Sequence, residues 1–416
     1  MTKNNTENPK KEMRSIPFSP PDIREEDIEM VVEALRSGWI TTGPRTKEFE
    51  KELTAYLGSA GTVCLNSATA ALELSLRIMG IGPGDEVIVT AYTYTASASV
   101  IEHVGAKIVM VDVQPDTVLM DLDAVEAAIT ERTKAIIPVD VGGVIVEYDD
   151  LYRCLEAHRD LYRPRTERQR KLGRIAVIAD CAHSLGATKN GVHAGAIGDF
   201  SCFSFHAVKN LTTSEGGALS WRKELPFDSA ELYKAVQLLS LHGQNKDALK
   251  KNQLGAWEYD ILIPGYKCNM TDICAALGLS QFKRYAEIME RRHAIIRRYN
   301  KSVVDACGCW AISQEGENFY GSGHLYLARL PHANAEQRNA FIAKMGEKGV
   351  ACNVHYKPLP MMTAYRNMGF SIENFPNAYA FYENEITLPL HTVLTDEDVE
   401  YVCNAFEATF QELFRA

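Results

Sequence analysis

The pattern of hydrophobic and polar residues changes its period along the chain. Near residues 25–36 apolar side chains recur at the spacing of an amphipathic helix, on a face formed by Ile28, Val31, Val32 and Leu35. A second helical pattern covers residues 46–57. Beyond it, short apolar runs alternate with helical patterns. Strands are expected at 63–65, 86–90, 107–111, 135–139, 175–179, 200–205 and 218–221, with helices at 67–79, 95–104, 121–129 and 148–157.

These runs are apolar throughout, which is typical of strands buried on both faces. Short buried strands that alternate with helices predict an α/β domain with a mainly parallel central sheet. The C-terminal third has a different pattern. A helical stretch near 272–306, rich in Arg and Glu, is expected to bridge two domains. After it we expect strands at 325–330 and 351–355 and helices at 335–348 and 396–414.

The predicted organisation is therefore a flexible tail at 1–15 and two domains. The large domain covers 16–272, and a smaller C-terminal α+β domain, including the bridging helix, covers 273–416. The formal net charge of -10 argues against nonspecific binding to nucleic acid. No apolar run approaches the ~20 residues that span a bilayer, and the first fifteen residues lack a signal-peptide core, so a cytoplasmic protein without membrane contact is expected.

The ten cysteines of the chain are expected to be reduced thiols. Cys307 and Cys309 lie two residues apart, but no second close cysteine pair or histidine cluster accompanies them. No metal site is therefore expected.

Two residues suggest chemistry by their place between strands. Lys209 lies in a loop between two buried strands, where an unpaired ammonium is costly. A desolvated lysine has a lowered pKa and becomes an amine nucleophile. Asp180 ends an apolar strand, where open α/β sheets place ligand-binding residues. Such a carboxylate pairs with a protonated ring nitrogen, or it simply caps the next helix.

Two weaker signals precede these residues in the chain. The turn 66–71 consists of small and hydroxyl residues that lead from a strand into a helix, as in phosphate sites or ordinary capping turns. Tyr94 follows a strand and could stack on an aromatic cofactor or simply pack in the core. A phosphate turn, an aromatic residue, a strand-end Asp and a buried Lys, in this order, resemble the pyridoxal phosphate (PLP) enzymes of the aspartate aminotransferase fold.

More specifically, the chain resembles the DegT/StrS family of nucleotide-sugar aminotransferases from about Pro17 to its C-terminus. The resemblance is carried by the strings at 38–44, 66–71, 180–187, 204–217 and 265–272. It implies a PLP-dependent transferase of fold type I. It also implies that Lys209 holds PLP as a Schiff base and moves the proton during transfer, while Asp180 pairs with the pyridine nitrogen.

The resemblance extends to further site residues. It implies that His183 lies near the 3-hydroxyl of PLP, that Tyr94 stacks on its ring, and that the phosphate is held by Ala68, Thr69 and Ser204. Either Lys267 or Asn269 reaches the phosphate from a partner subunit, which makes a homodimer the expected unit. On the substrate side the matching positions are Thr41, Thr42, His324, His355 and Tyr356. For the two histidines a purely structural role is an equal alternative.

The implied reaction moves an amino group from L-glutamate to a keto group, at C4 or C3, of a nucleotide-linked sugar. Alternatives are a free keto sugar or cyclitol as acceptor, or a PLP-binding regulatory protein. An NAD-dependent oxidoreductase is disfavoured because no G-x-G-x-x-G string opens a helix after the first strand. Related dehydratases carry His in place of the Schiff-base Lys, so Lys209 disfavours that activity too.

Two segments depart from the family pattern. Residues 158–174 form a basic insertion, expected to be a solvated loop or exposed helix. Alternatively, this insertion is a strap that offers Arg side chains to a substrate diphosphate, in its own or in a neighbouring subunit. The second departure is Val141–Val144, where relatives have a more polar, aromatic turn. Both departures bear on the identity of the sugar rather than on amino transfer.

Overall fold

The computed structural model describes residues 14–245 and 258–415. Its centre is a seven-stranded sheet in the order β1-β9-β8-β5-β4-β2-β3, in which only β9 runs against the other strands. The strands are β1 (Gly61–Leu65), β2 (Glu86–Thr90), β3 (Lys107–Val111), β4 (Thr133–Ile137), β5 (Ala176–Asp180), β8 (Phe200–Ser204) and β9 (Gly217–Trp221). The predicted α/β class with a mainly parallel sheet is confirmed.

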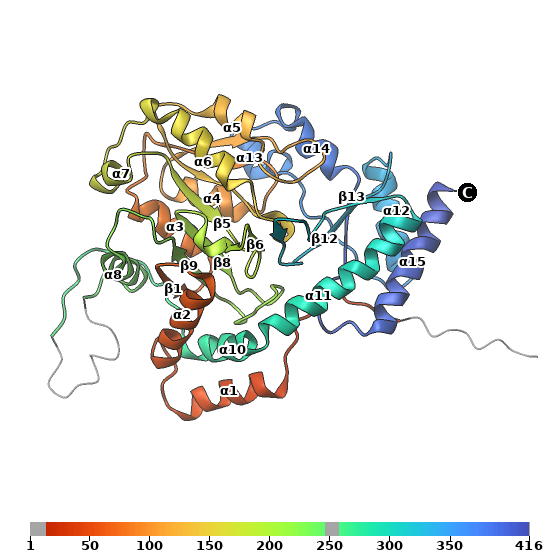
Figure 1. Ribbon diagram of the computed structural model, residues 1–416, viewed down its shortest axis with the longest axis horizontal. Helices are drawn as coiled ribbons and strands as arrows, with labels where there is room; N and C mark the ends of the chain where they lie inside the picture. Colours follow the sequence, from red (N-terminus) through yellow and green to blue (C-terminus); the bar gives the residue numbers. More distant parts are fainter. Residues whose placement is uncertain (1–13, 246–257, 416) are drawn as a thin grey trace, which may run out of the picture.

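Helices cover both faces of this sheet, as the continuously apolar strands require (Figure 1). In β5, for example, Ile178 belongs to one hydrophobic core and Val177 to the other. The first core is completed by α3 (Ala68–Ile78), α4 (Thr95–His103) and α8 (Ser229–Ser240). The second is completed by α2 (Pro44–Leu57), α5 (Leu122–Ala128), α6 (Tyr148–Ala157) and α10 (Asp272–Lys283).

A long helix, α11 (Tyr285–Asn300), leads from the large sheet to a third core (Figure 1). The stretch predicted as helix at 272–306 is thus divided into α10, α11 and a π-helical turn at 301–306. The third core contains α12 (Ala335–Glu347), α15 (Asp396–Phe414) and the antiparallel sheet of β10 (Trp310–Ala311), β12 (Tyr326–Arg329) and β13 (Glu385–Leu388). The domain limits at 16–272 and 273–416 stay a prediction.

The remaining elements are short. A third sheet joins β6 (Thr188–Lys189), β7 (Val192–His193) and β11 (Phe319–Tyr320), and two further helices are α13 (Thr363–Asn367) and α14 (Pro376–Tyr382). Of the predicted tail at 1–15, all but the last two residues lie outside the described part of the chain. Across the described ranges, no helix combines the length and the apolar character needed to cross a bilayer.

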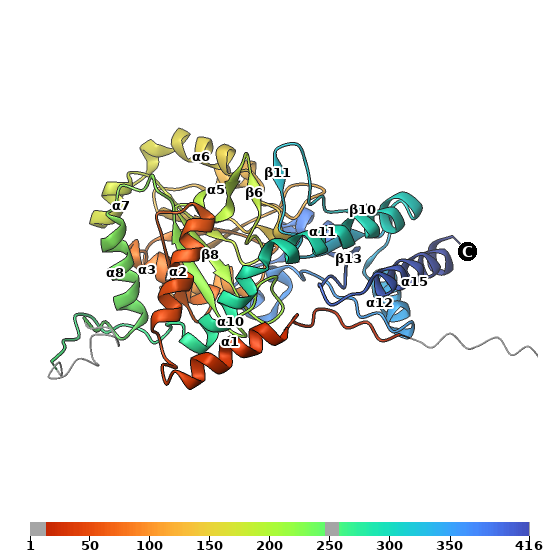
Figure 2. The same ribbon diagram turned by 60° about the horizontal axis from the view of Figure 1, so that its bottom comes forward.

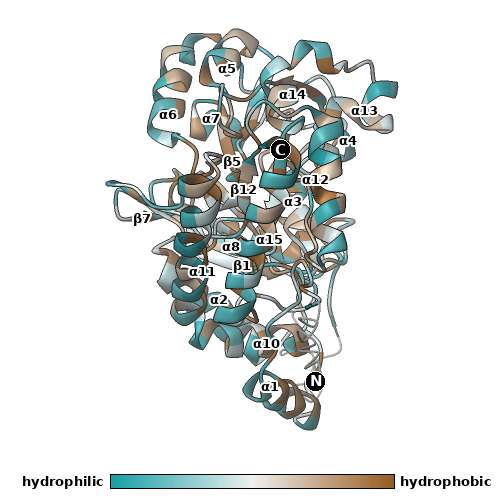
Figure 3. Cartoon of the chain, turned by 90° about the vertical axis from the view of Figure 1, so that its right-hand side faces the viewer, coloured by the Kyte–Doolittle hydropathy of each residue, from teal (hydrophilic) through white to brown (hydrophobic). Residues whose placement is uncertain are grey.

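The apolar face of the first helix does not point into the core of this chain. In α1 (Glu25–Arg36) Ile28 is 47% exposed and Leu35 52%, whereas Asp27 and Ala34 are buried. Arg284 donates to the Asp27 carboxylate at 2.8 Å, and α1 packs on α10 with the side that carries Asp27 and Ala34 (Figure 2). Hydrophobic residues remain on the outside of α1, at one end of the molecule (Figure 3).

The strand predicted at 351–355 is wrong. This segment makes a single bridge, between Asn353 and Thr387, and then turns away from the sheet. Two backbone hydrogen bonds of 3.0 and 2.8 Å join these residues, so the segment lies beside β13 for one residue pair only. The segment is instead a partly buried loop, exposed at Ala351 and Asn353, that leads to the functional site described below.

The basic insertion at 158–174 is largely exposed, as expected, but parts of it pack on the large domain. It contains α7 (Glu167–Leu172), in which Gln169 and Leu172 are buried. Arg168 donates to the carbonyl of Ile78, and Gln169 donates to that of Met79, so the insertion binds the last carbonyls of α3. Arg165 also donates to Asp85, just before β2, so the insertion lies at the amino-terminal edge of the sheet, whereas Lys209 follows the carboxyl end of β8. A strap that offers Arg to a substrate stays a prediction.

Candidate active site

The loop that carries Lys209 is pinned between β8 and β9. The amide of Phe205 donates to the carbonyl of Gly216 at 2.9 Å, and the amide of Thr213 donates to that of Phe205 at 2.9 Å. Lys209 is a half-buried residue, and desolvation of its ammonium lowers its pKa to about 8, against the opposing effect of the Asp180 charge. An amine with this pKa is partly neutral near physiological pH and is therefore nucleophilic.

Asp180 lies at the carboxyl end of β5, as predicted, and is buried. Ser97, in the first turn of α4, donates to its carboxylate at 2.7 Å, and the amide of Ala182 donates at 3.1 Å. Burial raises the pKa of this carboxyl, while both hydrogen bonds and the charge of Lys209 lower it. The site thus places a carboxylate within electrostatic reach of the Lys209 amine.

His183 has a defined tautomer. The amide of Gly142 donates to Nδ1 at 3.2 Å, so Nδ1 is an acceptor and the ring hydrogen is on Nε2. Nε2 lies 3.1 Å from the hydroxyl of Tyr356 and donates to it. Burial, with a smaller effect of the Lys209 charge, holds the pKa of His183 well below its usual range. The residue is therefore a neutral imidazole.

The turn at Val141–Gly143 explains why glycine is needed beside this histidine. Gly142 and Gly143 have φ angles of 70° and 97°, in the left-handed region. A Cβ on Gly143 would lie 2.1 Å from the Ser322 hydroxyl oxygen and 3.2 Å from the His324 amide nitrogen. The turn at Val141–Val144, which departs from the family pattern, thus packs against His183 and His324 and supports both side chains.

His324 contacts His183, with ring centroids 4.3 Å apart and the ring planes tilted by 41°. Asn210 uses its amide nitrogen to donate to the carbonyl of Ser322 at 2.8 Å, so its oxygen is the acceptor for His324 Nδ1 at 2.9 Å. Burial holds the pKa of His324 well below its usual range as well. The sequence-predicted residues Lys209, His183 and His324 line one small hollow.

Two more predicted residues lie beside this group. Tyr94 precedes α4, is 62% exposed, and has its ring centroid 6.1 Å from that of Tyr356. His355 stacks on Phe18 at 5.5 Å and contacts the ring of Tyr356 at 5.1 Å. A single chain therefore gathers Lys209, Asp180, His183, Tyr94, His324, His355 and Tyr356 at one place.

The predicted phosphate turn lies at the start of α3. Ser67 caps the helix by accepting a hydrogen bond from the amide of Ala70, and Ala68 and Thr69 form its first turn. Gly217 lets β9 pass directly beneath this turn, because a Cβ there would lie 2.4 Å from the carbonyl carbon of Ser67. Ser204 is the strand partner of Gly217. Backbone amides at a helix N-terminus next to hydroxyl groups fit a phosphate.

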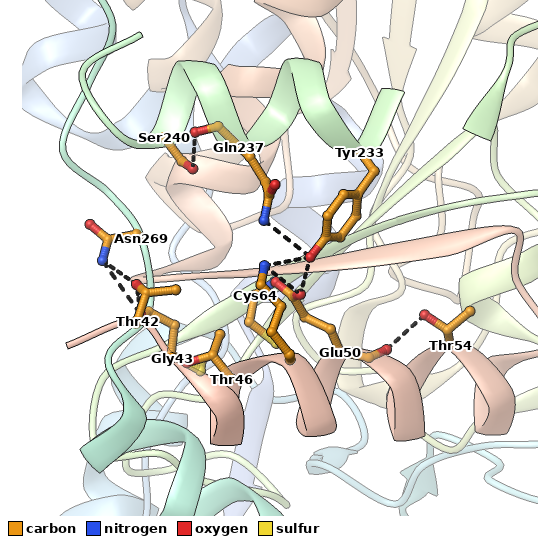
Figure 4. A network of polar contacts seen from close by, with 12 residues as sticks. Thr42, Gly43, Thr46, Glu50, Thr54, Cys64, Tyr233, Gln237, Ser240 and Asn269 are labelled. Atoms are coloured by element: carbon orange, nitrogen blue, oxygen red, sulfur yellow. Dashed lines mark hydrogen bonds and ion pairs between the residues drawn. The ribbon is translucent and has the colours of Figure 1, made fainter. Parts of the chain in front are cut away.

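Thr42 and Asn269 form a second group (Figure 4), and Thr41 lines the same cavity. Thr42 donates to the carbonyl of Met270 and accepts from the amide group of Asn269, whose oxygen also binds Lys267. These residues adjoin the phosphate turn, because the amide of Asn66 donates to the carbonyl of Cys268 at 2.8 Å. Thr41, Thr42 and Asn269 line a cavity of about 370 Å³ that is separate from the Lys209 hollow.

Some residues of the site gave no signal in the sequence. Ser97 holds Asp180, Gly142 holds His183 and Asn210 holds His324, each through one hydrogen bond across a long stretch of chain. A serine in a helix or a glycine in a turn has no pattern that marks it as a partner of a distant side chain. Only Asn210 lies next to a residue that the sequence marks, Lys209.

The donor set defines a class of enzyme. A nucleophilic amine, a carboxylate at a strand end, an exposed aromatic ring and an anion-binding helix start fit an aldehyde cofactor with a ring nitrogen and a phosphate, which is PLP. The site residues lie at the carboxyl ends of the strands, the edge at which open α/β sheets bind ligands.

Comparison with known proteins supports the assignment of a PLP-binding site. The model of the DegT/DnrJ/EryC1/StrS aminotransferase family matches residues 21–407. A putative sugar aminotransferase of Streptococcus pneumoniae, in its PMP-form, superimposes with a TM-score of 0.93 at 54% identity, over 96% of this chain and 100% of that one. Its PLP-form matches at 52% identity.

Curated relatives are similar over nearly their whole length. The spore coat polysaccharide biosynthesis protein SpsC of Bacillus subtilis is 36% identical over 94% of this chain and 96% of its own. The UDP-4-amino-4-deoxy-L-arabinose–oxoglutarate aminotransferase of Shewanella sediminis is 35% identical over 94% and 97%. The chain belongs to the DegT/DnrJ/EryC1/StrS aminotransferase family. It is a PLP-dependent sugar aminotransferase.

Proposed function

We propose that this enzyme moves an amino group from L-glutamate to a keto group, at C4 or C3, of a nucleotide-linked sugar. The observation that carries the proposal is the Lys209 amine, with its pKa lowered to about 8 beside Asp180 and close to neutral histidines. The name of the Shewanella sediminis relative supports a nucleotide-linked sugar, and that of SpsC supports a role in cell-surface polysaccharide or amino-sugar biosynthesis.

Each site residue has a proposed role. When bound, PLP supplies an aldehyde and an electron-withdrawing ring. Lys209 would hold the aldehyde covalently and, as a free amine, would carry the proton to and from the reacting carbon of the substrate. Asp180 would pair with the ring nitrogen, and His183 would lie near the 3-hydroxyl. Tyr94 would cover the ring face, and Ala68, Thr69 and Ser204 would hold the phosphate.

We further propose a cytoplasmic homodimer with shared active sites. Large apolar side chains stay exposed in the single chain, namely Ile23, Ile28, Leu35, Ile40, Ile261, Leu262 and Ile263. Exposed apolar groups of this kind are typical of protein interfaces. Lys267 and Asn269, with Thr41 and Thr42, belong to a group separate from the Lys209 hollow, which fits residues that complete the site of a partner subunit. His324, His355 and Tyr356 would face the sugar.

The test is an absorbance spectrum of the PLP-loaded protein before and after L-glutamate, together with turnover of keto substrates. Lys209→Ala should abolish turnover, whereas Lys301→Ala, which changes an exposed lysine of the bridging region, should leave it unchanged. Full activity of Lys209→Ala would refute the assignment. A bound chromophore that does not respond to glutamate would instead indicate a regulatory protein.

A panel of acceptors separates the remaining alternatives. Keto sugars are supplied with and without the nucleotide, and keto cyclitols are included. We expect amination of the nucleotide-linked sugars alone. Amination of free keto sugars or cyclitols at an equal kcat/KM would refute the nucleotide-linked part of the proposal and leave the aminotransferase activity in place.

A further inference from the structure

Two buried side chains of β13, those of Glu385 and Thr387, form hydrogen bonds that fix His355. Thr387 Oγ1 lies 3.0 Å from His355 Nδ1, and Glu385 Oε1 lies 2.6 Å from Thr387 Oγ1. The second carboxyl oxygen of Glu385 accepts a hydrogen bond of 2.9 Å from the backbone amide of His355. Glu385 thus binds the same residue twice, once at its backbone and once, through Thr387, at its ring.

The fold makes this chain of contacts rigid. Residues 385 and 387 are two apart in a strand, so their side chains point to the same face. Thr387 is also fixed by its backbone bridge to Asn353, two residues before His355. Phe18 covers the ring of His355, and the neighbouring Tyr356 reaches His183. With Nδ1 engaged by Thr387, Nε2 is the ring nitrogen left to meet a ligand.

The groups around Glu385 set its protonation. Burial raises the pKa of its carboxyl to about 8, and the opposing effects come first from Thr387, then from the His355 amide and from the charge of Arg338 in α12. Three further titratable groups face this carboxyl: Tyr92, Cys352 and Tyr356. The imidazole itself stays neutral, because burial and the Lys209 charge lower the pKa of His355 to about 4.

We propose that Glu385 and Thr387 are positioning residues that form a proton relay to His355 and set its tautomer. With Glu385 protonated, its Oε1–H donates to Thr387, the threonine hydroxyl donates to Nδ1, and the ring hydrogen is on Nε2. When Glu385 loses its proton, Thr387 donates to Oε1 and accepts from Nδ1–H, so Nε2 becomes an acceptor. The net change is one proton released to solvent, while the histidine hydrogen moves from Nε2 to Nδ1.

The consequence for binding rests on the function proposed above. Hydroxyl and phosphate oxygens of a nucleotide-linked sugar accept hydrogen bonds, so the Nε2–H tautomer suits them. Below pH ~8 the relay presents this donor, and above pH ~8 it presents a lone pair. The KM for the sugar should therefore rise as Glu385 ionises, whereas the reaction with glutamate should follow other groups.

The decisive measurement is ¹⁵N NMR of histidine-labelled protein at about pH 7 and about pH 9, with the His355 signal assigned from His355→Gln. We expect the Nε2–H tautomer at the lower pH and Nδ1–H at the higher. Thr387→Ser keeps the hydroxyl and should keep the change. Thr387→Val removes the hydroxyl and should make the tautomer independent of pH. It should also raise the sugar KM at pH ~7 about tenfold.

Thr409→Val is the matched control, because it removes a buried threonine hydroxyl that bonds only within the third core. It should change neither the tautomer nor the KM. A His355 tautomer that stays the same across this pH range in the unmodified protein overturns the relay, as does an unchanged titration in Thr387→Val. The NMR result needs no sugar, so failure of the proposed substrate is seen separately, as absence of turnover with the acceptor panel.

Discussion

Replacing Asp272 tests how the site is held together. This buried carboxylate, at the first position of α10, accepts hydrogen bonds from the amides of Gly43, Arg45 and Thr46 at 2.7, 3.1 and 3.0 Å. The Thr46 hydroxyl donates to it as well, at 2.7 Å. These amides belong to the N-cap and first turn of α2, where Pro44 has no N–H. Asp272 therefore caps α2 from another helix.

The cap comes from outside because Gly43 has no side chain and has no room for one. A Cβ on Gly43 would lie 1.7 Å from the indole nitrogen of Trp39. The same carboxylate residue also anchors the candidate substrate loop, since its amide donates to the carbonyl of Thr41 at 3.1 Å. Loss of the carboxylate should thus loosen α2 and Thr41 together.

The expected magnitude follows from the contacts. Loss of a helix N-cap costs ~1 kcal/mol, and each buried amide left without a partner costs a further ~1–3 kcal/mol. With three amides affected and partial relief by water, Asp272→Ala should lower the local stability of this turn by ~3–4 kcal/mol. Amide exchange there should accelerate more than about 100-fold, at ~1.4 kcal/mol for each factor of ten.

Hydrogen exchange measured by mass spectrometry on the peptide 39–50 is the assay. Asp228→Ala is the control, because Asp228 caps α8 through one exposed hydrogen bond of 2.9 Å from the Glu231 amide. It should affect α8 by ~1 kcal/mol and leave α2 unchanged. The capping role of Asp272 is refuted if Asp272→Ala speeds exchange in α2 no more than Asp228→Ala speeds it in α8. An unchanged sugar KM when the turn is loosened refutes the link between this turn and the substrate.

Two further predictions concern the Lys209 hollow. The rate at which apoprotein takes up PLP, followed by absorbance, should rise with pH through about 8, because the neutral amine of Lys209 is the nucleophile. Asp180→Asn removes a charge that raises this pKa, so its midpoint should move to lower pH; a midpoint that stays in place contradicts the pairing. Gly143→Ala should lower stability by ~2–4 kcal/mol and the thermal midpoint with it, from left-handed backbone strain and overlap with Ser322. Gly346→Ala, in the open surface of α12, should leave that midpoint unchanged or raise it slightly.

The central sheet could be predicted because the amino-acid composition of its strands reflects their burial on both faces. A strand such as Ala176–Asp180 is apolar at every position because helices cover both of its faces. Asp180 and Lys209 were recognisable for the same reason, since a charged group that adjoins such a strand needs a function or a partner. These predictions needed only local sequence.

Features that the sequence could not predict depend on residues far away in the chain. An apolar stripe shows that α1 has two different faces, but it does not say which face docks on its own chain. The side that carries Asp27, which pairs with Arg284, packs on α10 and leaves Ile28 outside. In the same way, the segment 351–355 is extended and partly buried without being a strand, because it pairs with β13 at one residue only.

The arrangement of charges around Lys209 has a chemical consequence. Burial and the lysine charge hold the pKa values of His183, His324 and His355 below their usual range, so the three imidazoles stay neutral at physiological pH. Under the proposed function, His324 and His355 would therefore orient an acceptor sugar, and His183 would contact the cofactor, through hydrogen bonds rather than charge. Two groups close to the site have a pKa of about 8, namely Lys209 and Glu385. The pH dependence of PLP uptake by the apoprotein should accordingly report the Lys209 amine, and that of the sugar KM the Glu385 carboxyl. Neither should report a histidine near its ordinary pKa of ~6.5.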